Sequence, residues 1–156
     1  MLSAKDIIRN AHPGFTGALL VLAFGAIMLA MVASTAKLHC RTGTAVTIGH
    51  HAVCLEIAET PTALALGLGG RSQLPEGQGM LFVFSQAKTR VFWMRGMEFP
   101  LDMIWIRDHH VVGFETNVAA DGGVRRISTP PVDAVIELNA GDVARFGIAV
   151  GDAIRR

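Results

Sequence analysis

Two acidic residues, Asp102 and Glu137, lie inside strongly apolar stretches of this sequence, "FPLDMIWI" and "AVIEL". A charge in such a setting is expensive unless a partner satisfies it. Two carboxyl groups in apolar surroundings can also have well-separated pKa values, which acid–base catalysis exploits. Asp102 and Glu137 are therefore the best candidates for acid and base chemistry. No nucleophile elbow, phosphate loop, dinucleotide fingerprint or His-Glu-x-x-His motif accompanies them, so the sequence supports no particular enzyme class.

Arg71 and Trp93 are the side chains that could recognise a ligand. Arg71 follows a diglycine, which lets its guanidinium reach a carboxylate or an anionic ligand. A structural ion pair is the favoured alternative, so we expect Arg71 to contact Asp102 or Glu137. Trp93 offers a flat face on which a sugar or another planar ligand could stack. The apolar residues around it favour a packed core tryptophan instead.

The segment "LDMIWIRDHHVVGFETNV" predicts a hairpin whose register decides what faces Asp102. A two-residue turn at Asp108-His109 is favoured, because such turns are the commonest hairpin connection. It pairs Arg107 with His110, Ile106 with Val111, Ile104 with Gly113, and Asp102 with Glu115. Two facing carboxylates would need a cation, supplied by Arg71 or Arg95. A three-residue turn would instead place Asp102 opposite Thr116 and remove the acid pair.

The sequence holds a loose group of soft-metal ligand types, namely His39, Cys40, His50, His51 and Cys54. Their spacing matches no zinc-finger pattern, and a solvated turn is the favoured interpretation of the two adjacent histidines. We therefore expect no metal and no cofactor. In an oxidising compartment the two cysteines could pair. The expected first hairpin argues against a cross-strand bridge, because it places Cys54 near Val46 and would require Cys40 to fold back.

The chain from about residue 44 onwards shows short strand patterns separated by turn signals. We expect a hairpin over residues 45–58, a short helix capped by Thr60 with Pro61 at its first position, and a loop over 71–79. The apolar runs "MLFVF" and "VFWM" predict central strands covered on both faces. The hairpin over 101–118, a strand at 134–138, and a helical turn with a terminal strand in 139–154 complete the pattern. An α+β fold follows: mostly β, a compact, partly closed β-barrel with two short helices, preceded by one N-terminal apolar helix.

An uncharged apolar segment occupies residues 14–33, which is long enough to cross a membrane as a helix of ~20 residues. Lys5 and Arg9 precede it, as expected on the cytoplasmic side. A retained membrane anchor is favoured, because the run exceeds the ~7–15 apolar residues of an ordinary signal peptide. Cleavage after Ala36 is the alternative. Under either interpretation the rest of the chain is exported to the periplasmic side of the cell envelope.

The expected organisation is an anchor or signal segment over residues 1–36, a linker over 37–43 and a β-rich globular domain over 44–156. We expect the membrane, through residues 14–33, to be a partner, and a truncation to residues 42–156 to fold as a monomer. The 156 residues carry 14 basic and 13 acidic side chains, a formal net charge of +1. This balance provides no basic field for a phosphate backbone, so we expect no nucleic-acid partner.

Three segments carry a resemblance to a known family: "RSQLPEGQGMLFVF", "FWMRGMEFPLDMIWI" and "VIELNAGDVARFGIAVGD". Over residues 44–156 the chain resembles the family called domain of unknown function 192. The resemblance implies a compact β-rich domain and brings no established activity. The positions that match are Arg71, Leu74, Gly79-Met80-Leu81-Phe82, Trp93-Met94, Pro100-Leu101-Asp102, Glu137 and Gly141. The chain departs from the family pattern at Gly69-Gly70, in place of Met and an aromatic residue, and at Arg95-Gly96-Met97, in place of Lys-Asn-Thr.

Three functions are compatible with these residues. The favoured one is a non-catalytic envelope module that binds a small molecule, with a saccharide as one candidate, in a cleft formed by Arg71, Trp93, Asp102 and Glu137. The second is a hydrolase that uses the two carboxyl groups. The third is a structural or interaction module at the membrane. The candidate ligand-binding residues are Arg71, Trp93, Arg95, Asp102, Glu115 and Glu137, and no catalytic residue is assigned.

Overall fold

The computed structural model describes residues 40–120 and 122–156. The apolar segment 14–33 and the N-terminal helix predicted for it lie outside the described residues. Within the described residues, no helix has the length and apolar character that crossing a membrane requires.

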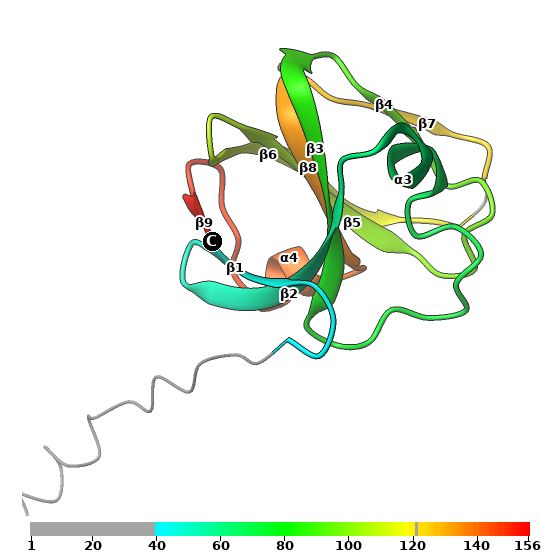
Figure 1. Cartoon of the computed structure of the whole chain (residues 1–156), viewed down its shortest axis with the longest axis horizontal. Helices are drawn as coiled ribbons and strands as arrows, with labels where there is room; N and C mark the ends of the chain where they lie inside the picture. Colours follow the sequence, from blue (N-terminus) through cyan, green and yellow to red (C-terminus); the bar gives the residue numbers. More distant parts are fainter. Residues whose placement is uncertain (1–39, 121) are drawn as a thin grey trace, which may run out of the picture. The chain divides into compact units, whose positions relative to one another are not determined.

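The fold is mostly β, with one large sheet, one two-stranded ribbon and two short helices (Figure 1). The large sheet has seven strands in the order β6-β5-β8-β3-β2-β1-β9. Its strands are β1 (Thr44–Ile48), β2 (His51–Ala58), β3 (Gln78–Lys88), β5 (Leu101–Arg107), β6 (His110–Val118), β8 (Val132–Asn139) and β9 (Ile154–Arg155). The ribbon pairs β4 (Val91–Trp93) with β7 (Arg125–Ile127). The sheet curls into a half-barrel, so the mostly-β α+β prediction is confirmed at this level.

The edges of the curled sheet approach each other at one end. His109 O accepts a hydrogen bond from Ile154 N at 2.8 Å, and Val111 exchanges backbone hydrogen bonds with residues 151 and 152. An isolated bridge joins His110 to Ala153. These bonds connect the β5–β6 turn to the segment before β9 and satisfy backbone groups that an open edge would expose.

Helix α3 (Pro61–Leu66) connects β2 to β3, which are the parallel pair of the sheet. Parallel neighbours need a crossover connection, and this short helix with its following loop supplies one. Thr60 caps the helix by accepting a hydrogen bond from Ala63 N, and Pro61 occupies the first turn. The helix ends at Gly67, whose φ of +54° suits a residue without a side chain. The predicted caps and glycine stop of this helix are confirmed.

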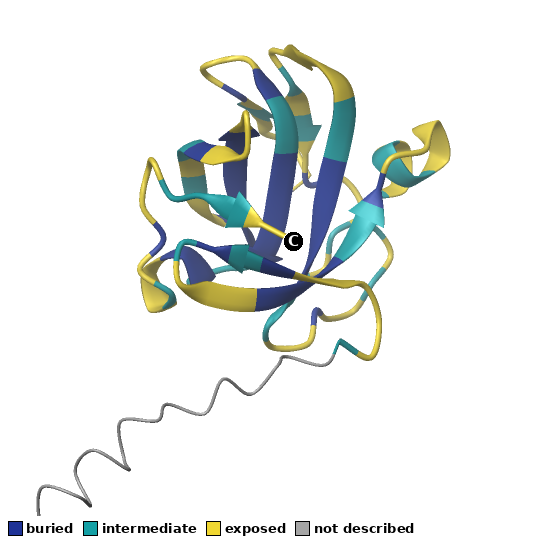
Figure 2. Cartoon of the chain, turned by 60° about the vertical axis from the view of Figure 1, so that its left-hand side comes forward, coloured by how far each residue is buried: buried dark blue, intermediate teal, exposed yellow. Residues whose placement is uncertain are grey.

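Both faces of the large sheet are covered, and each carries its own apolar core. Figure 2 shows that the strands of this sheet contain many of the buried residues. Strand β8 shows the alternation: Ile136 and Leu138 enter one core, whereas Val135 enters the other and Glu137 follows it on the same face. The first core packs against α4 (Asp142–Arg145) and the residues that follow it. We call the opposite side, which carries Val135 and Glu137 and is covered by α3 and β4, the cavity face.

Two strand predictions need correction. Residues 91–93 of the run "VFWM" form a short strand of the outer ribbon, not a central strand. Phe92 and Met94 pack into the core, whereas Val91 and Trp93 are exposed. In the β5–β6 hairpin the two-residue turn is confirmed, with Asp108 and His109 at φ of +50° and +60°. Register shifts further along the hairpin then pair Ile104 with Phe114. The predicted Ile104–Gly113 and Asp102–Glu115 pairs are wrong.

Cys40 and Cys54 form a disulfide, with their Cα atoms 5.5 Å apart. The sequence argument against this bond failed because Cys40 does fold back to reach Cys54. The hairpin register also differs by one residue, since the two-residue turn pairs Cys54 with Ala45 instead of Val46. The chain before β1 also folds back along β2. Gly43 permits this with a φ of +83°, and a Cβ atom there would lie 2.5 Å from the carbonyl oxygen of Leu55. A truncation that begins at residue 42 would remove the disulfide.

Candidate ligand-binding cavity

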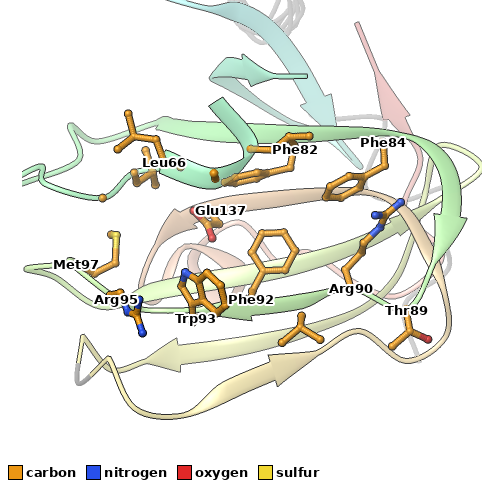
Figure 3. A pocket seen from close by; sticks show the side chains of 16 residues that line it. Leu66, Phe82, Phe84, Thr89, Arg90, Phe92, Trp93, Arg95, Met97 and Glu137 are labelled. Carbon is orange, nitrogen blue, oxygen red and sulfur yellow. The ribbon is translucent and has the colours of Figure 1, made fainter. Parts of the chain in front are cut away.

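A cavity of about 330 Å³ opens on the cavity face of the sheet, between α3 and β4 (Figure 3). This volume lies at the lower end of the range typical of small-molecule sites. Helix α3 and the glycine-rich turn after it form one wall, and β4 with the residues around it forms the opposite wall. The lining residues are 64–69, Phe82, Phe84, 89–93, Arg95, Met97 and Glu137.

Aromatic rings make up much of the cavity wall, and Phe92 is at their centre. Its ring packs edge-on against Phe82 at 5.2 Å between centroids, and contacts Phe84 at 6.5 Å and Trp105 at 5.8 Å. Trp93 is 52% exposed and lines the cavity from the rim. These rings provide several apolar faces for a bound molecule.

Two arginines line the cavity, and both lie over aromatic rings. The guanidinium carbon of Arg90 is 3.9 Å from the centre of the Phe84 ring, and its Nη2 donates to Gln86 O at 2.6 Å. The guanidinium carbon of Arg95 is 5.6 Å from the centre of the Trp93 ring. Such cation–π contacts hold the two positive charges beside the walls.

Glu137 is the acidic residue of the cavity, and Figure 3 shows its carboxyl group between the two walls. On the sheet it pairs with Met80 of β3 and Met103 of β5, so its strand neighbours offer no charge. The side chain is only 5% exposed. Among the residues that the structure describes, none forms a hydrogen bond or an ion pair with its carboxyl group. Burial raises the pKa of Glu137 to about 8, so the group is mostly protonated at neutral pH.

Glu137 is the middle member of a row of three glutamates across the cavity face. Register alternates them with methionines: Glu56, Met80, Glu137, Met103, Glu115. Arg71 donates two hydrogen bonds to the outer Glu56, at 2.6 and 2.9 Å, and this holds the pKa of Glu56 below its usual range. The other outer residue, Glu115, lies 3.4 Å from Arg126. The two outer carboxylates thus have arginine partners, whereas the central one has none among the described residues.

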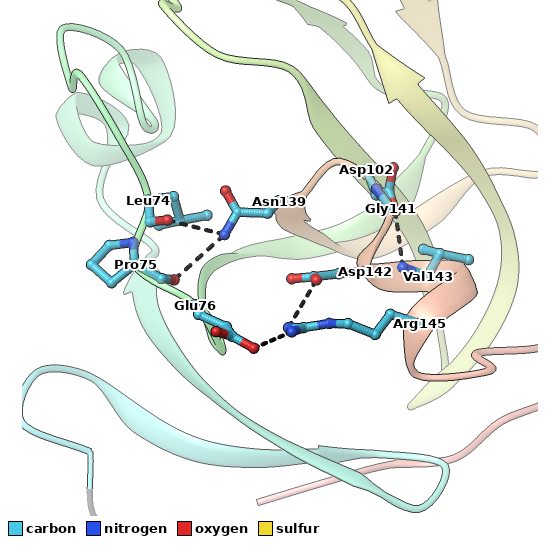
Figure 4. Close-up of polar contacts among 9 residues, drawn as sticks. All are labelled: Leu74, Pro75, Glu76, Asp102, Asn139, Gly141, Asp142, Val143 and Arg145. Carbon is cyan, nitrogen blue, oxygen red and sulfur yellow. Dashed lines mark hydrogen bonds and ion pairs between the residues drawn. The ribbon is translucent and has the colours of Figure 1, made fainter.

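Asp102 lies on the opposite face of the sheet and is fully buried. Its Oδ1 accepts a hydrogen bond from Asn117 N at 2.8 Å, and its Oδ2 accepts from Gly141 N at 3.0 Å and Val143 N at 2.9 Å. Figure 4 shows the bond to Val143, in the first turn of α4. Backbone donors at a helix N-terminus suit a carboxylate. Asp102 therefore joins β5 to β6 and to the start of α4.

The segment before β3 is tied to α4 by a second set of polar contacts (Figure 4). Arg145 forms ion pairs with Glu76 and, at 3.0 Å, with Asp142. Asn139 donates to the carbonyl oxygen of Leu74 at 3.0 Å. Burial raises the pKa of Asp142, and the charge of Arg145 opposes that rise. Among the described residues, no group of three His, Cys, Asp or Glu side chains could hold a metal ion.

The family model of domain of unknown function 192 (DUF192), described as "Uncharacterized ACR", matches residues 44–156. The chain belongs to the DUF192 family. No curated protein matches it.

Two solved structures resemble this DUF192 protein. One is a "putative transcription regulator" from Sinorhizobium meliloti, with 32% sequence identity and a TM-score of 0.69, covering 71% of this chain and 91% of the other. The second is a protein of unknown function from Novosphingobium aromaticivorans, with 30% identity and a TM-score of 0.70, covering 80% of this chain and 94% of the other. The family and these relatives establish the fold and bring no defined activity.

The structure separates the predicted site residues of this DUF192 domain into two groups. Trp93, Arg95 and Glu137 line one cavity. Arg71, Asp102 and Glu115 do not line it and have protein partners instead.

Several site predictions are therefore wrong. Arg71 binds Glu56 instead of Asp102 or Glu137, because the connection between β2 and β3 that carries Arg71 brings it close to β2. Asp102 and Glu137 occupy opposite faces, since Asp102 pairs with Leu138 while Glu137 pairs with Met103. They cannot work as an acid pair on one substrate. Trp93 is not a packed core residue, because half of its surface is exposed at the cavity.

Sequence reasoning missed Phe84, Arg90 and Phe92, which contribute to the cavity walls. A clue was available in "KTRVFW", where a strand of alternating exposure would direct Arg90 and Phe92 to one side and Val91 to the other. The uniformly apolar residues of "VFW" hid that alternation. Glu56 was also missed, although its place in a strand with Leu55 and Ile57 marks it as the residue on the other face.

Proposed function

We propose that this DUF192 domain is a non-catalytic binding module that takes a small, ring-containing molecule into the cavity between α3 and β4. One observation carries the proposal: the carboxyl group of Glu137 is buried, points into an aromatic-lined cavity and has no partner among the described residues. A buried polar group without a partner lowers the stability of the folded protein. Such a group in a native structure therefore calls for a functional explanation. A ligand that satisfies this group would explain why the residue stands there.

A binding role is favoured over hydrolysis by the placement of the carboxyl groups. A glycoside hydrolase uses two carboxyl groups on either side of one bond. Here Asp102 faces the other side of the sheet, and its oxygens are engaged by three backbone N–H groups. Of these two carboxyl groups, Glu137 alone lines the cavity. One carboxyl group can recognise a ligand but does not provide the pair that hydrolysis uses. A saccharide stacked on Trp93 is one form that the ligand could take.

We further propose that the domain works on the exported side of the cell envelope. The apolar segment 14–33 and the two cations before it support this location. The disulfide between Cys40 and Cys54 supports it independently, because such bonds persist in oxidising compartments. The Sinorhizobium relative is described as a "putative transcription regulator", but the basic and acidic residues of this chain nearly balance and provide no basic field for nucleic acid.

An interaction module is the second candidate, and exposed apolar side chains on the outer ribbon favour it. Val91 of β4 pairs with Ile127 of β7, and both are exposed beside Trp93. Apolar side chains gathered on a surface often mark a contact site. The cavity favours a small molecule over a protein as the first candidate.

Blocking the cavity tests the proposed function. Ala65 lines the cavity and is exposed on α3, so Ala65→Phe adds a bulky side chain at the cavity wall without replacing a core residue. Thr62→Phe makes a similar change at another exposed position of α3 that does not line the cavity. Ligand-observed NMR on the full chain would screen single-ring molecules that are cationic, neutral or anionic, together with monosaccharides. We expect binding that Ala65→Phe abolishes and Thr62→Phe retains. Binding that survives Ala65→Phe unchanged would contradict the proposal.

A further inference from the structure

The row of three glutamates indicates what kind of ligand would complete the cavity. Neighbouring strands are about 4.8 Å apart, so each outer glutamate lies about 10 Å from Glu137 across one methionine. Arg71 serves Glu56 and Arg126 serves Glu115. Within residues 40–120 and 122–156, the protein thus supplies a cation to each outer carboxylate and none to the central one. A positively charged group at Glu137 would complete the same pattern.

The walls of the cavity suit the same kind of ligand. Phe82, Phe92 and Trp93 present aromatic faces and edges near the carboxyl group, and Phe84 lines the cavity further along, beside Arg90. An aromatic face attracts a cation, and the attraction grows when water is excluded. The two arginines are the other charged groups that line the cavity. Arg90 is held by Phe84 and by the carbonyl of Gln86, and Arg95 is exposed over Trp93.

We infer that the cavity binds an organic cation, in which a protonated amine joined to an aromatic or other apolar body contacts the carboxylate of Glu137. This inference rests on the proposed function, since it specifies the ligand of the same cavity. The amine donates its N–H groups to the two carboxylate oxygens, and the apolar body lies against Phe92 and Trp93. A charge-assisted contact of this kind, out of water, is among the stronger hydrogen bonds in proteins.

Binding of the amine is coupled to the loss of one proton. Without ligand, burial raises the pKa of Glu137 to about 8, so the group carries its proton at pH 6. The ammonium requires the carboxylate, and the proton of Glu137 therefore leaves for solvent when the ammonium enters. At pH 6 about 1% of Glu137 is ionised, against about half at pH 8. The affinity for an amine should consequently rise about 50-fold between these pH values.

Three matched probes test this inference on the full chain: benzylamine, benzyl alcohol and benzoate. They share a ring and differ in the charge of the attached group. The chain has two tryptophans, of which Trp105 is buried and Trp93 is half exposed at the cavity. Protection of tryptophan fluorescence from acrylamide quenching therefore reports occupation of the cavity beside Trp93.

We expect benzylamine to protect Trp93 at concentrations at least tenfold lower than benzyl alcohol at pH 8, a ratio typical of hydrogen bonds to a charged group. Benzoate should bind most weakly. The benzylamine affinity should rise about 50-fold from pH 6 to pH 8, while the benzyl alcohol affinity should stay constant. In Glu137→Gln the preference for the amine and its pH dependence should both disappear. Glu56→Gln is the matched control, because Glu56 does not line the cavity, and it should retain both.

The outcomes separate this inference from the proposed function. If benzyl alcohol or benzoate protects Trp93 as well as benzylamine does, the cavity binds ligands but the inferred cation is wrong. If Glu137→Gln retains the preference for the amine, Glu137 is not its partner and the inference also fails. If none of the three probes protects Trp93 at any concentration, both the inference and the proposed binding function are contradicted.

Discussion

Asp102 and Glu137 are buried carboxyl groups on neighbouring strands of one sheet, yet their surroundings differ completely. Asp102 faces the start of α4 and accepts hydrogen bonds from three backbone N–H groups. Glu137 faces the cavity, and no described residue pairs with it. The first arrangement satisfies a carboxylate and stabilises the fold. The second leaves a group that burial forces to keep its proton, which is typical of a site that awaits a ligand.

The largest expected effect on stability is that of replacing Asp102. Asp102→Ala leaves the N–H groups of Asn117, Gly141 and Val143 without their acceptor inside the fold. We expect the free energy of unfolding to fall by about 4 kcal/mol, because buried donors to a charged acceptor are costly to leave unpaired. Urea denaturation at pH 7 measures this loss. Asp102→Asn keeps one acceptor oxygen and should lose about half as much. A loss below about 1 kcal/mol for the alanine variant would show that these bonds do not hold α4.

The cavity carboxyl group should give an effect of the opposite sign. The pKa of Glu137 is about 8 in the folded chain against a model value of 4.5. Between these pH values the unfolded chain releases a proton that the folded chain retains, so the wild type loses stability as pH rises from 4.5 to 8. Glutamine does not titrate. Glu137→Gln should therefore be more stable than the wild type by on the order of 3 kcal/mol at pH 7.

The same denaturation series at several pH values checks the sign. The advantage of Glu137→Gln should be small near pH 4, widen up to pH 8 and then stay constant. An advantage that does not change with pH would indicate an ordinary packing effect. A glutamine variant less stable than the wild type at pH 7 would indicate that Glu137 has a cationic partner in the protein.

The smallest effect should come from Glu56, an outer member of the glutamate row, and its partner Arg71. Arg71 and Glu56 are each about one-third exposed, with side-chain accessibilities of 35% and 34%. Solvent screening therefore limits the loss in Arg71→Met to below about 1 kcal/mol. Hydrogen bonding by Arg71 lowers the pKa of Glu56, so this contribution is present above the unfolded pKa and disappears as pH falls through the folded one. The measurement is the difference between urea midpoints at pH 7 and at pH 3. An Arg71→Met loss as large as that of Asp102→Ala would remove the distinction between the two faces.

The features that local sequence encodes were predicted well. Thr60, Pro61 and Gly67 define α3, because a cap, a first-turn proline and a glycine stop act over a few residues. The turn at Asp108-His109 was also found, since its two-residue loop is a local choice. Glu137 was recognised as unusual because a charge interrupts "AVIEL".

The features that failed depend on contacts between distant segments. The partner of Arg71 is Glu56, which only the crossover from β2 to β3 brings near it. The register at Asp102 depends on irregularities of the β5–β6 pair that the turn does not determine, although Gly113 marks the region, where a Cβ atom would lie 3.3 Å from Trp105. The cavity lies between α3 and β4, which pairs with β7 in a separate ribbon instead of joining the large sheet. No local pattern in "VFWM" distinguishes such a strand from a central one.

The most direct test of this account is the titration of the Glu137 carboxyl group in the full chain. The ¹³C chemical shift of its side-chain carboxyl carbon, assigned by its loss in Glu137→Gln, reports ionisation as pH is raised from 4 to 10. The account predicts a midpoint near 8, because the group is buried without a partner among the described residues. A midpoint at or below 4.5 would contradict it, since an ordinary or lowered pKa would mean that a cation such as Arg95 or abundant water already stabilises the carboxylate.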